Sequence, residues 1–136
     1  MRSIFIAFLC LLTLCSCKKI IDKQKENFVL SVMTEGQWVI TQFVRSGDTL
    51  TSSFSPYTFQ FNRDYTVDAI KENGIESKGS WNGDPENMII SASFPNAADP
   101  VAMINGSWHI DRNSLSYVEA SQKNGAEEKL LRLDKK

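Results

Sequence analysis

Short runs in which apolar and polar residues alternate constrain the fold of this chain most. Tyr57, Phe59 and Phe61 fall on one face of an extended strand, and the polar residues between them fall on the other. Similar runs recur at short intervals, separated by turn-forming pairs such as Asn73-Gly74, which are typical of tight hairpins. We count about eight such runs and no long helical pattern. The sequence therefore predicts an all-β domain of short antiparallel strands, closed into an up-and-down barrel.

One segment ahead of the strands follows a helical period instead. Phe28, Val29, Val32 and Met33 share one face of a helix, and Gly36 follows as a helix-ending residue. The sequence therefore predicts a short N-terminal helix before the first strand.

Each of the three tryptophans stands two residues after a glycine. The pairs are Gly36 with Trp38, Gly79 with Trp81, and Gly106 with Trp108. Because residues two apart on a strand share a face, the glycine leaves room for the ring or lets another backbone approach closely. Met88 and Leu115 stand seven residues after the second and third tryptophans, which predicts a strand, a turn and a returning apolar strand in both copies. We interpret the tryptophans as core residues, and a stacking platform for a sugar or another ligand is the alternative.

The first residues have the order of an export signal. Arg2 precedes an apolar run from Ile4 to Leu14, and a tetrad ending in Cys17 follows, as in a secretory signal peptide. A membrane-spanning helix is the alternative, but eleven residues rise only about 16 Å against roughly 30 Å of hydrocarbon. The tetrad resembles the bacterial lipobox. That resemblance implies cleavage before Cys17 and fatty acyl chains, such as palmitate, on this residue.

These features divide the chain into three parts. Residues 1–16 are the predicted signal peptide, residues 17–27 the lipidated cysteine with a charged tether, and residues 28–136 the barrel domain. More than one acyl chain would make membrane anchoring stable. A polybasic contact of the tether with lipid headgroups is an alternative, diluted by Asp22 and Glu26. Lys18, instead of an aspartate, after the cysteine favours the outer membrane of the cell envelope by analogy and leaves the membrane face open.

Charge and residue content argue against several classes of activity. Without Arg2 the chain has fourteen cations against sixteen acids, so no basic field is available to attract nucleic acid. His109 is the only histidine, and the two cysteines other than Cys17 lie in the signal, which disfavours zinc sites and Cys-His or Ser-His-Asp catalysis. We expect His109 to face outward, beside an inward Trp108. The sequence thus predicts a protein that is not an enzyme and has no metal or cofactor.

The pattern as a whole resembles a known family. The opening Gly36 and Trp38, the central run from Tyr57 to Val67, the repeated Gly-Ser-Trp and the lipobox are similar to the small lipocalin-like, or calycin, lipoproteins of Bacteroidota. The resemblance implies that Arg132, in the last strand, packs across Trp38 in a cation–π contact. A solvated arginine on an edge strand is the alternative.

The predicted function follows from that resemblance. A barrel of eight strands can hold one small ligand or be filled by side chains. We expect a small apolar or amphipathic molecule at a mouth formed by residues 46–56 and 95–104, with Phe54, Met103 and Ile104 as ligand-binding residues. The alternative is a filled barrel that acts as a non-enzymatic adaptor or inhibitor through protein contacts.

Overall fold

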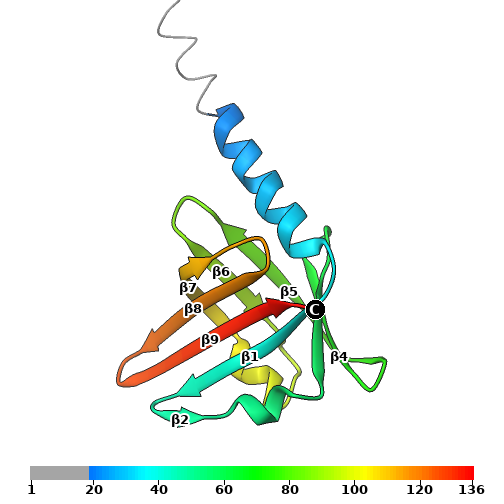
Figure 1. The fold of residues 1–136 in the computed structure, drawn as a ribbon, viewed down its shortest axis with the longest axis vertical. Helices are drawn as coiled ribbons and strands as arrows, with labels where there is room; N and C mark the ends of the chain where they lie inside the picture. Colours follow the sequence, from blue (N-terminus) through cyan, green and yellow to red (C-terminus); the bar gives the residue numbers. More distant parts are fainter. Residues whose placement is uncertain (1–18) are drawn as a thin grey trace, which may run out of the picture.

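The computed structural model describes residues 19–136, which form a closed β-barrel with one helix at its N-terminal side (Figure 1). The strands are β1 (Trp38–Arg45), β2 (Asp48–Thr49), β3 (Tyr57–Phe61), β4 (Thr66–Lys71), β5 (Gly74–Asp84), β6 (Ile89–Ser93), β7 (Gly106–Asn113), β8 (Tyr117–Asn124) and β9 (Glu127–Lys135). Two short 3-10 helices, η1 (Thr51–Phe54) and η2 (Val101–Ile104), interrupt the strand sequence.

The sheet closes because its first and last long strands pair. Each long strand is antiparallel to the next one along the chain, and β1 pairs with both β3 and β9. β2 adds only a two-residue hairpin at the end of β1. The barrel therefore has eight strands in up-and-down order, which confirms the predicted all-β fold class. The pairing of β1 with β9 leaves neither of these two strands as a free edge along its length.

Aromatic side chains fill the barrel interior. The alternating pattern of β3 places Tyr57, Phe59 and Phe61 inside, as the sequence predicts. Phe43 lies at the centre of the core, with ring centroids 4.8 Å from Phe54 and 6.2 Å from Trp108. Because the large rings occupy the space between the strands, the core of the barrel is packed rather than hollow.

All three indole rings are buried, and each N–H group donates a hydrogen bond to a backbone carbonyl. The acceptors are Met33 for Trp38 at 2.9 Å, Asn62 for Trp81 at 3.0 Å and Ile104 for Trp108 at 2.7 Å. The rings therefore bury a large apolar area without leaving a polar group unpaired. They also tie the strands to the segments that cover the two ends of the barrel.

At Gly79 the structure favours the second of the two predicted roles, the close approach of another backbone. A Cβ atom there would meet the backbone oxygen of Ser93 at the end of β6 and lie 2.8 Å from Cδ1 of Phe94. At Gly106, φ is +113°, a conformation that L side chains rarely adopt. These positions need glycine for backbone approach and backbone conformation.

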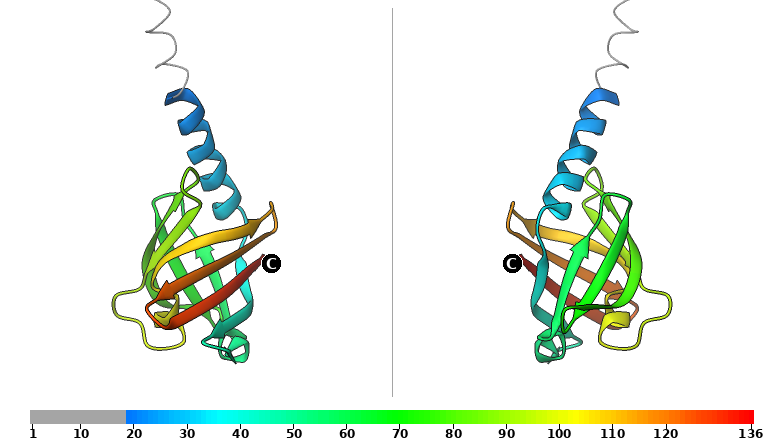
Figure 2. Two further views of the ribbon diagram at one scale, coloured as in Figure 1. Left: turned by 90° about the vertical axis from the view of Figure 1, so that its left-hand side faces the viewer. Right: turned by 90° about the vertical axis from the view of Figure 1, so that its right-hand side faces the viewer.

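The N-terminal helix spans residues 19–34 and is longer than predicted. Within the described residues it already includes the nine residues before Phe28, because this charged segment also has good helix formers such as Lys23, Gln24 and Glu26. The helix projects away from the barrel rim in both side views (Figure 2). Within residues 19–136, no helix has the length and apolar character needed to cross a membrane.

The two ends of the barrel are built differently. The turns after β3, β5 and β7 lie at the end that carries the helix, while β2, η1 and η2 lie at the opposite end. Phe54 of η1 and Val101 and Ile104 of η2 are buried there. These side chains close the end of the barrel away from the helix.

Candidate functional site

A cavity of about 330 Å³ opens at the helix end of the barrel. The helix covers one side of it, and the turns after β5 and β7 form the rim. The lining side chains are mostly apolar and come from four segments: Val29, Val32 and Met33 of the helix; Pro85 after β5; Ile89, Ile90 and Ile110 of β6 and β7; and Leu115 and Val118 near the start of β8. This size and lining are typical of sites for small apolar ligands.

The helix is held over this cavity by two local features. The indole of Trp38 donates its hydrogen bond to the carbonyl of Met33 in the last turn of the helix. Gly83 lets the helix approach β5, because a Cβ atom at this position would lie 2.9 Å from Cγ1 of Val29. The helix therefore contacts the barrel through its C-terminal half, and the cavity lies beside that contact.

The three residues predicted to bind a ligand lie at the opposite end. Phe54 and Ile104 are buried in the core, and Met103 lies against the end of β1, with its sulfur 3.9 Å from a guanidinium nitrogen of Arg45. The 3-10 turns direct Phe54 and Ile104 inward, while Met103 stays partly exposed, so these three side chains do not line one open mouth at residues 46–56 and 95–104. The cavity at the helix end is the better candidate site.

The predicted contact between Arg132 and Trp38 is also wrong. Leu131 and Leu133 are buried on the inner face of β9, so Arg132 between them points outward. Its guanidinium lies 4.4 Å from the ring centroid of Tyr117, whereas the Nζ atom of Lys135 lies 5.2 Å from the ring centroid of Trp38. The barrel has no edge at β9, so Arg132 is not an edge-strand arginine either.

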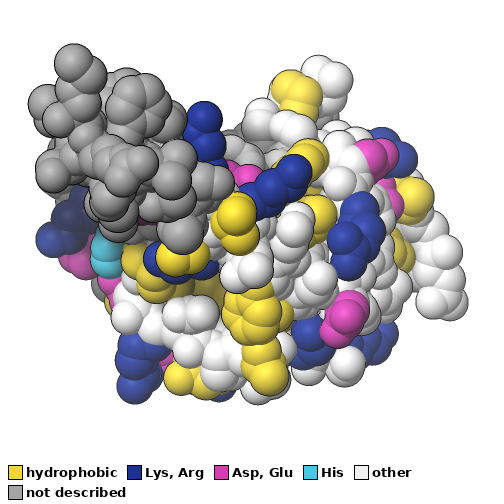
Figure 3. Space-filling model, turned by 90° about the horizontal axis from the view of Figure 1, so that it is seen from above, with side chains coloured by type: hydrophobic (Ala, Val, Ile, Leu, Met, Phe, Trp, Pro, Cys, Tyr) yellow, Lys and Arg dark blue, Asp and Glu magenta, His cyan; other side chains and the backbone are white. Residues whose placement is uncertain are grey.

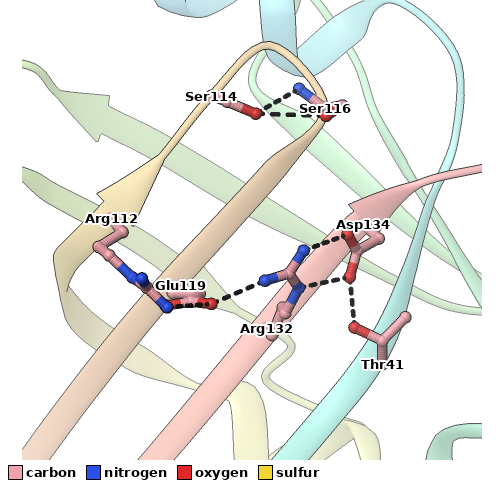
Figure 4. A network of polar contacts seen from close by, with 7 residues as sticks. All are labelled: Thr41, Arg112, Ser114, Ser116, Glu119, Arg132 and Asp134. Carbon is pink, nitrogen blue, oxygen red and sulfur yellow. Dashed lines mark hydrogen bonds and ion pairs between the residues drawn. The ribbon is translucent and has the colours of Figure 1, made fainter.

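Arg132 instead belongs to a row of ion pairs on the outside of the barrel (Figure 4). Its Nη1 atom donates a hydrogen bond to Glu119 at 2.7 Å, and its Nε atom donates one to Asp134 at 2.8 Å. Arg112 donates two more to Glu119, and the hydroxyl of Thr41 donates one to Asp134. The row links β7, β8, β9 and β1, so it spans the seam where the barrel closes.

The charges of this row are mutually compensated. Hydrogen bonds from Arg112 lower the pKa of Glu119, and hydrogen bonds from Arg132 lower the pKa of Asp134. Both carboxylates are therefore ionised and paired at neutral pH, which does not suit a general acid or base. We assign the row a structural role.

Other polar groups offer no catalytic arrangement in the described part of the chain. His109 lies on the outer face of β7, as predicted, with its Nδ1 atom 3.0 Å from Asp111. A hydrogen bond with Glu76 and burial raise the pKa of Tyr57 to about 12, so this phenol stays protonated at neutral pH. Among residues 19–136, no three His, Cys, Asp or Glu side chains gather to hold a metal ion. The predicted lipidation site, Cys17, lies outside the described residues.

The other side of the helix has the opposite character. A second cavity there, of about 400 Å³, is bordered by the acidic side chains of Glu26, Asp84 and Glu86, next to the rings of Tyr65 and Trp81. The backbone N–H groups of Glu86 and Asn87 bond the carboxylate of Asp84. Hydrogen bonds from Asn87 lower the pKa of this carboxyl group. The helix thus lies between a mainly apolar cavity and an acidic one, and Asp84 borders both.

The fold and the apolar cavity define a closed antiparallel barrel with a helix-covered pocket. Among solved structures, the chain is similar to a DUF4847 family protein from Bacteroides vulgatus, with 11% sequence identity and a TM-score of 0.54 over 78% of this chain and 96% of that one. This likeness supports the barrel fold alone. No protein-family model matches the chain, and no curated protein matches it.

One sequence signal could have located the cavity. Met88 and Leu115 occupy equivalent places seven residues after Trp81 and Trp108, and the structure places both in turns at the helix end, before β6 and β8 begin. They are exposed and do not start the returning strands as predicted. Two apolar residues in turns would have indicated an apolar surface at this rim.

Proposed function

We propose that this chain is a lipid-anchored, lipocalin-like protein of the bacterial cell envelope that binds a small apolar or amphipathic molecule in the cavity under the helix. The observation that supports the proposal most is the cavity itself, with about 330 Å³ of space and a mainly aliphatic lining. An apolar molecule that enters it leaves water at a gain of roughly 25 cal/mol for each Å² of buried apolar surface. The proposed site is the helix end of the barrel, where the core residues Met33, Ile90 and Val118 also line the cavity.

Ligand binding can be tested with a dansyl-labelled undecanoate, whose fluorescence rises in apolar surroundings. Leu115 lines the cavity and is 64% exposed, while Ile75 on β5 is 59% exposed and lies away from it. We expect Leu115→Asp to weaken probe binding about tenfold, which is about 1.4 kcal/mol. Ile75→Asp serves as the matched control and is expected to bind the probe like the unchanged protein. Equal affinities of the two variants would contradict a site in this cavity.

The proposed lipid anchor rests on the lipobox-like tetrad and is tested separately. Metabolic labelling with a fatty acid is expected to mark the protein, and Cys17→Ala is expected to abolish the label. A label that persists in this variant would contradict the anchor. Membrane fractionation of the labelled cells would test the proposed outer-membrane location.

A second function, as a non-enzymatic adaptor or inhibitor, draws on a different observation. The barrel interior is filled by aromatic rings, so the outer surface is available for protein contacts. Native mass spectrometry of protein from its own host separates the two proposals. A retained small molecule supports the ligand carrier, and a retained protein partner supports the adaptor.

A further inference from the structure

A groove continues from the apolar cavity along the same side of the helix. Its volume is about 360 Å³, and it extends to Ile21 in the first half of the helix. The groove and the cavity share the lining residues Phe28, Val29, Pro85, Ile110 and Asn113. The cavity is therefore open toward the start of the helix.

Exposed apolar side chains gather at this end of the molecule, most of them on the groove side and Tyr65 beside the acidic cavity. Of the eight large hydrophobic side chains exposed within residues 19–136, six lie at the helix end of the molecule. They are Ile20, Ile21, Phe28, Tyr65, Met88 and Leu115. Figure 3, seen from this end, shows such side chains next to lysine and arginine. A concentration of this kind marks an interaction surface, because isolated exposed hydrophobics are otherwise scattered.

Charge separates the two sides of the helix. Lys25 is the only charged residue among the described residues that line the groove. The cavity on the other side is bordered by Glu26, Asp84 and Glu86 and by no cation of the described chain. A surface with acidic headgroups would therefore attract the groove side and repel the other side.

The position of the groove in the chain indicates which surface it meets. The groove reaches Ile21, four residues after the proposed anchor at Cys17. Four residues span at most about 14 Å even when fully extended, so an anchored chain would hold this end of the groove close to the lipid headgroups. A helix with apolar side chains on one face can lie in the plane of that interface.

We propose that the groove side of the helix rests on the lipid surface, together with the rim turns at Met88 and Leu115. In this position the cavity takes up a single-chain amphiphile with an acidic headgroup directly from the bilayer and releases it there. This inference rests on the proposed ligand binding and lipid anchor. The apolar chain of the amphiphile follows the groove into the cavity, and Lys25 attracts its headgroup. The acidic side of the helix remains in water.

Spin labels on introduced cysteines test the contact. The full chain is purified from bacterial membranes and reconstituted into vesicles of phosphatidylethanolamine and phosphatidylglycerol. Ile21→Cys and Met88→Cys report on the groove, and Ile75→Cys is the control at a similarly exposed position away from it. The unsubstituted chain gives the labelling background. We expect oxygen, which concentrates in lipid, to relax the labels at positions 21 and 88 more than the control, and a water-soluble nickel reagent to relax them less.

Three results would overturn the inference. Equal responses of the labels at all three positions to both reagents would contradict contact between the groove and the lipid. Labels at positions 21 and 88 shielded from both reagents would indicate a protein partner or a second copy of this chain. A response to oxygen that is higher at position 75 than in the groove would place another face on the lipid.

Transfer of the dansyl-labelled undecanoate from the same vesicles tests the exchange. We expect Ile21→Asp to slow transfer several-fold relative to Ile75→Asp, because a carboxylate then stands at the lipid end of the groove. Equal transfer rates with intact binding of the probe in solution would overturn the exchange route and leave the proposed function standing. Absence of probe binding in solution would contradict the proposed function itself.

Discussion

The two ends of the barrel use similar apolar residues for opposite purposes. At the closed end, 3-10 turns direct Phe54 and Ile104 into the core, where they are almost fully buried. At the helix end, Met88 and Leu115 lie in turns and remain exposed beside a cavity. The difference teaches that an apolar residue in a loop of this barrel plugs the core or lines a site according to the local backbone, and not according to its residue type.

The largest expected effect tests the closed end. Phe54→Ala removes a ring that is 1% exposed and packs 4.8 Å from Phe43, centroid to centroid. We expect it to lower the free energy of unfolding by about 3 to 5 kcal/mol, because the cavity left behind cannot fully collapse. Urea denaturation measures the change. A loss below about 1 kcal/mol would show that the 3-10 turns do not plug the core.

The next largest expected effect tests the contact between the N-terminal helix and β5 at the helix end of the barrel. Gly83→Ala places a Cβ atom 2.9 Å from Cγ1 of Val29, so we expect a loss of about 1 to 3 kcal/mol through overpacking. Val29→Ala removes the atom that clashes, and the double variant is expected to recover most of that loss. A double-mutant cycle by urea denaturation measures the coupling. Additive effects of the two substitutions would mean that the helix does not rest on β5 in solution.

A smaller effect on stability is expected from the row of ion pairs on the outside of the barrel. Glu119 and Asp134 have ordinary pKa values of 4.5 and 3.8, and their pairing with arginines lowers both in the folded protein. The stabilisation is therefore complete above the ordinary values and is lost as the pH falls through the lower, folded values. We expect Arg132→Met to lower the Tm at pH 7 and to have a smaller effect at pH 3.

The control for Arg132→Met is Lys123→Met, which removes an exposed cation from the same sheet. Its effect on the Tm is expected to be small at both values of pH. An effect of Arg132→Met that is the same at pH 3 and pH 7 would contradict the role of the paired carboxylates.

The smallest expected effect returns to the helix end. Phe28 is 59% exposed beside the cavity, so Phe28→Ala is expected to change the free energy of unfolding by less than about 0.5 kcal/mol. Urea denaturation beside Phe54→Ala compares the two phenylalanines directly. If both substitutions cost the same, the two ends do not differ in the way described above.

The strands were predictable because their signals are local. The alternation in β3 fixes which side chains point inward, and Asn73-Gly74 fixes the hairpin between β4 and β5. The outward direction of His109 followed from the same period of two. The helical conformation of residues 19–27 was not predictable in this way, because most of their side chains are charged or polar and exposed.

The candidate site was harder to predict because it depends on contacts between distant segments. The cavity combines the helix with turns that follow β5 and β7, and no single segment predicts it.

The predicted contact between Arg132 and Trp38 was wrong because it, too, depends on how distant segments meet. The pairing of β1 with β9 places Lys135 opposite Trp38 and Gln42 opposite Arg132, and Arg132 points to the outer face of β9.

By itself, the amino-acid sequence determined the class of this domain: short antiparallel strands, tight turns and tryptophans suited to a core. Period and turn chemistry are properties of neighbouring residues, so they can be followed along the chain. Only the tertiary structure decided which end of the barrel is plugged, where the helix rests and which charges pair across the seam. These features depend on strand register and on the approach of segments far apart in the sequence, which no local pattern specifies.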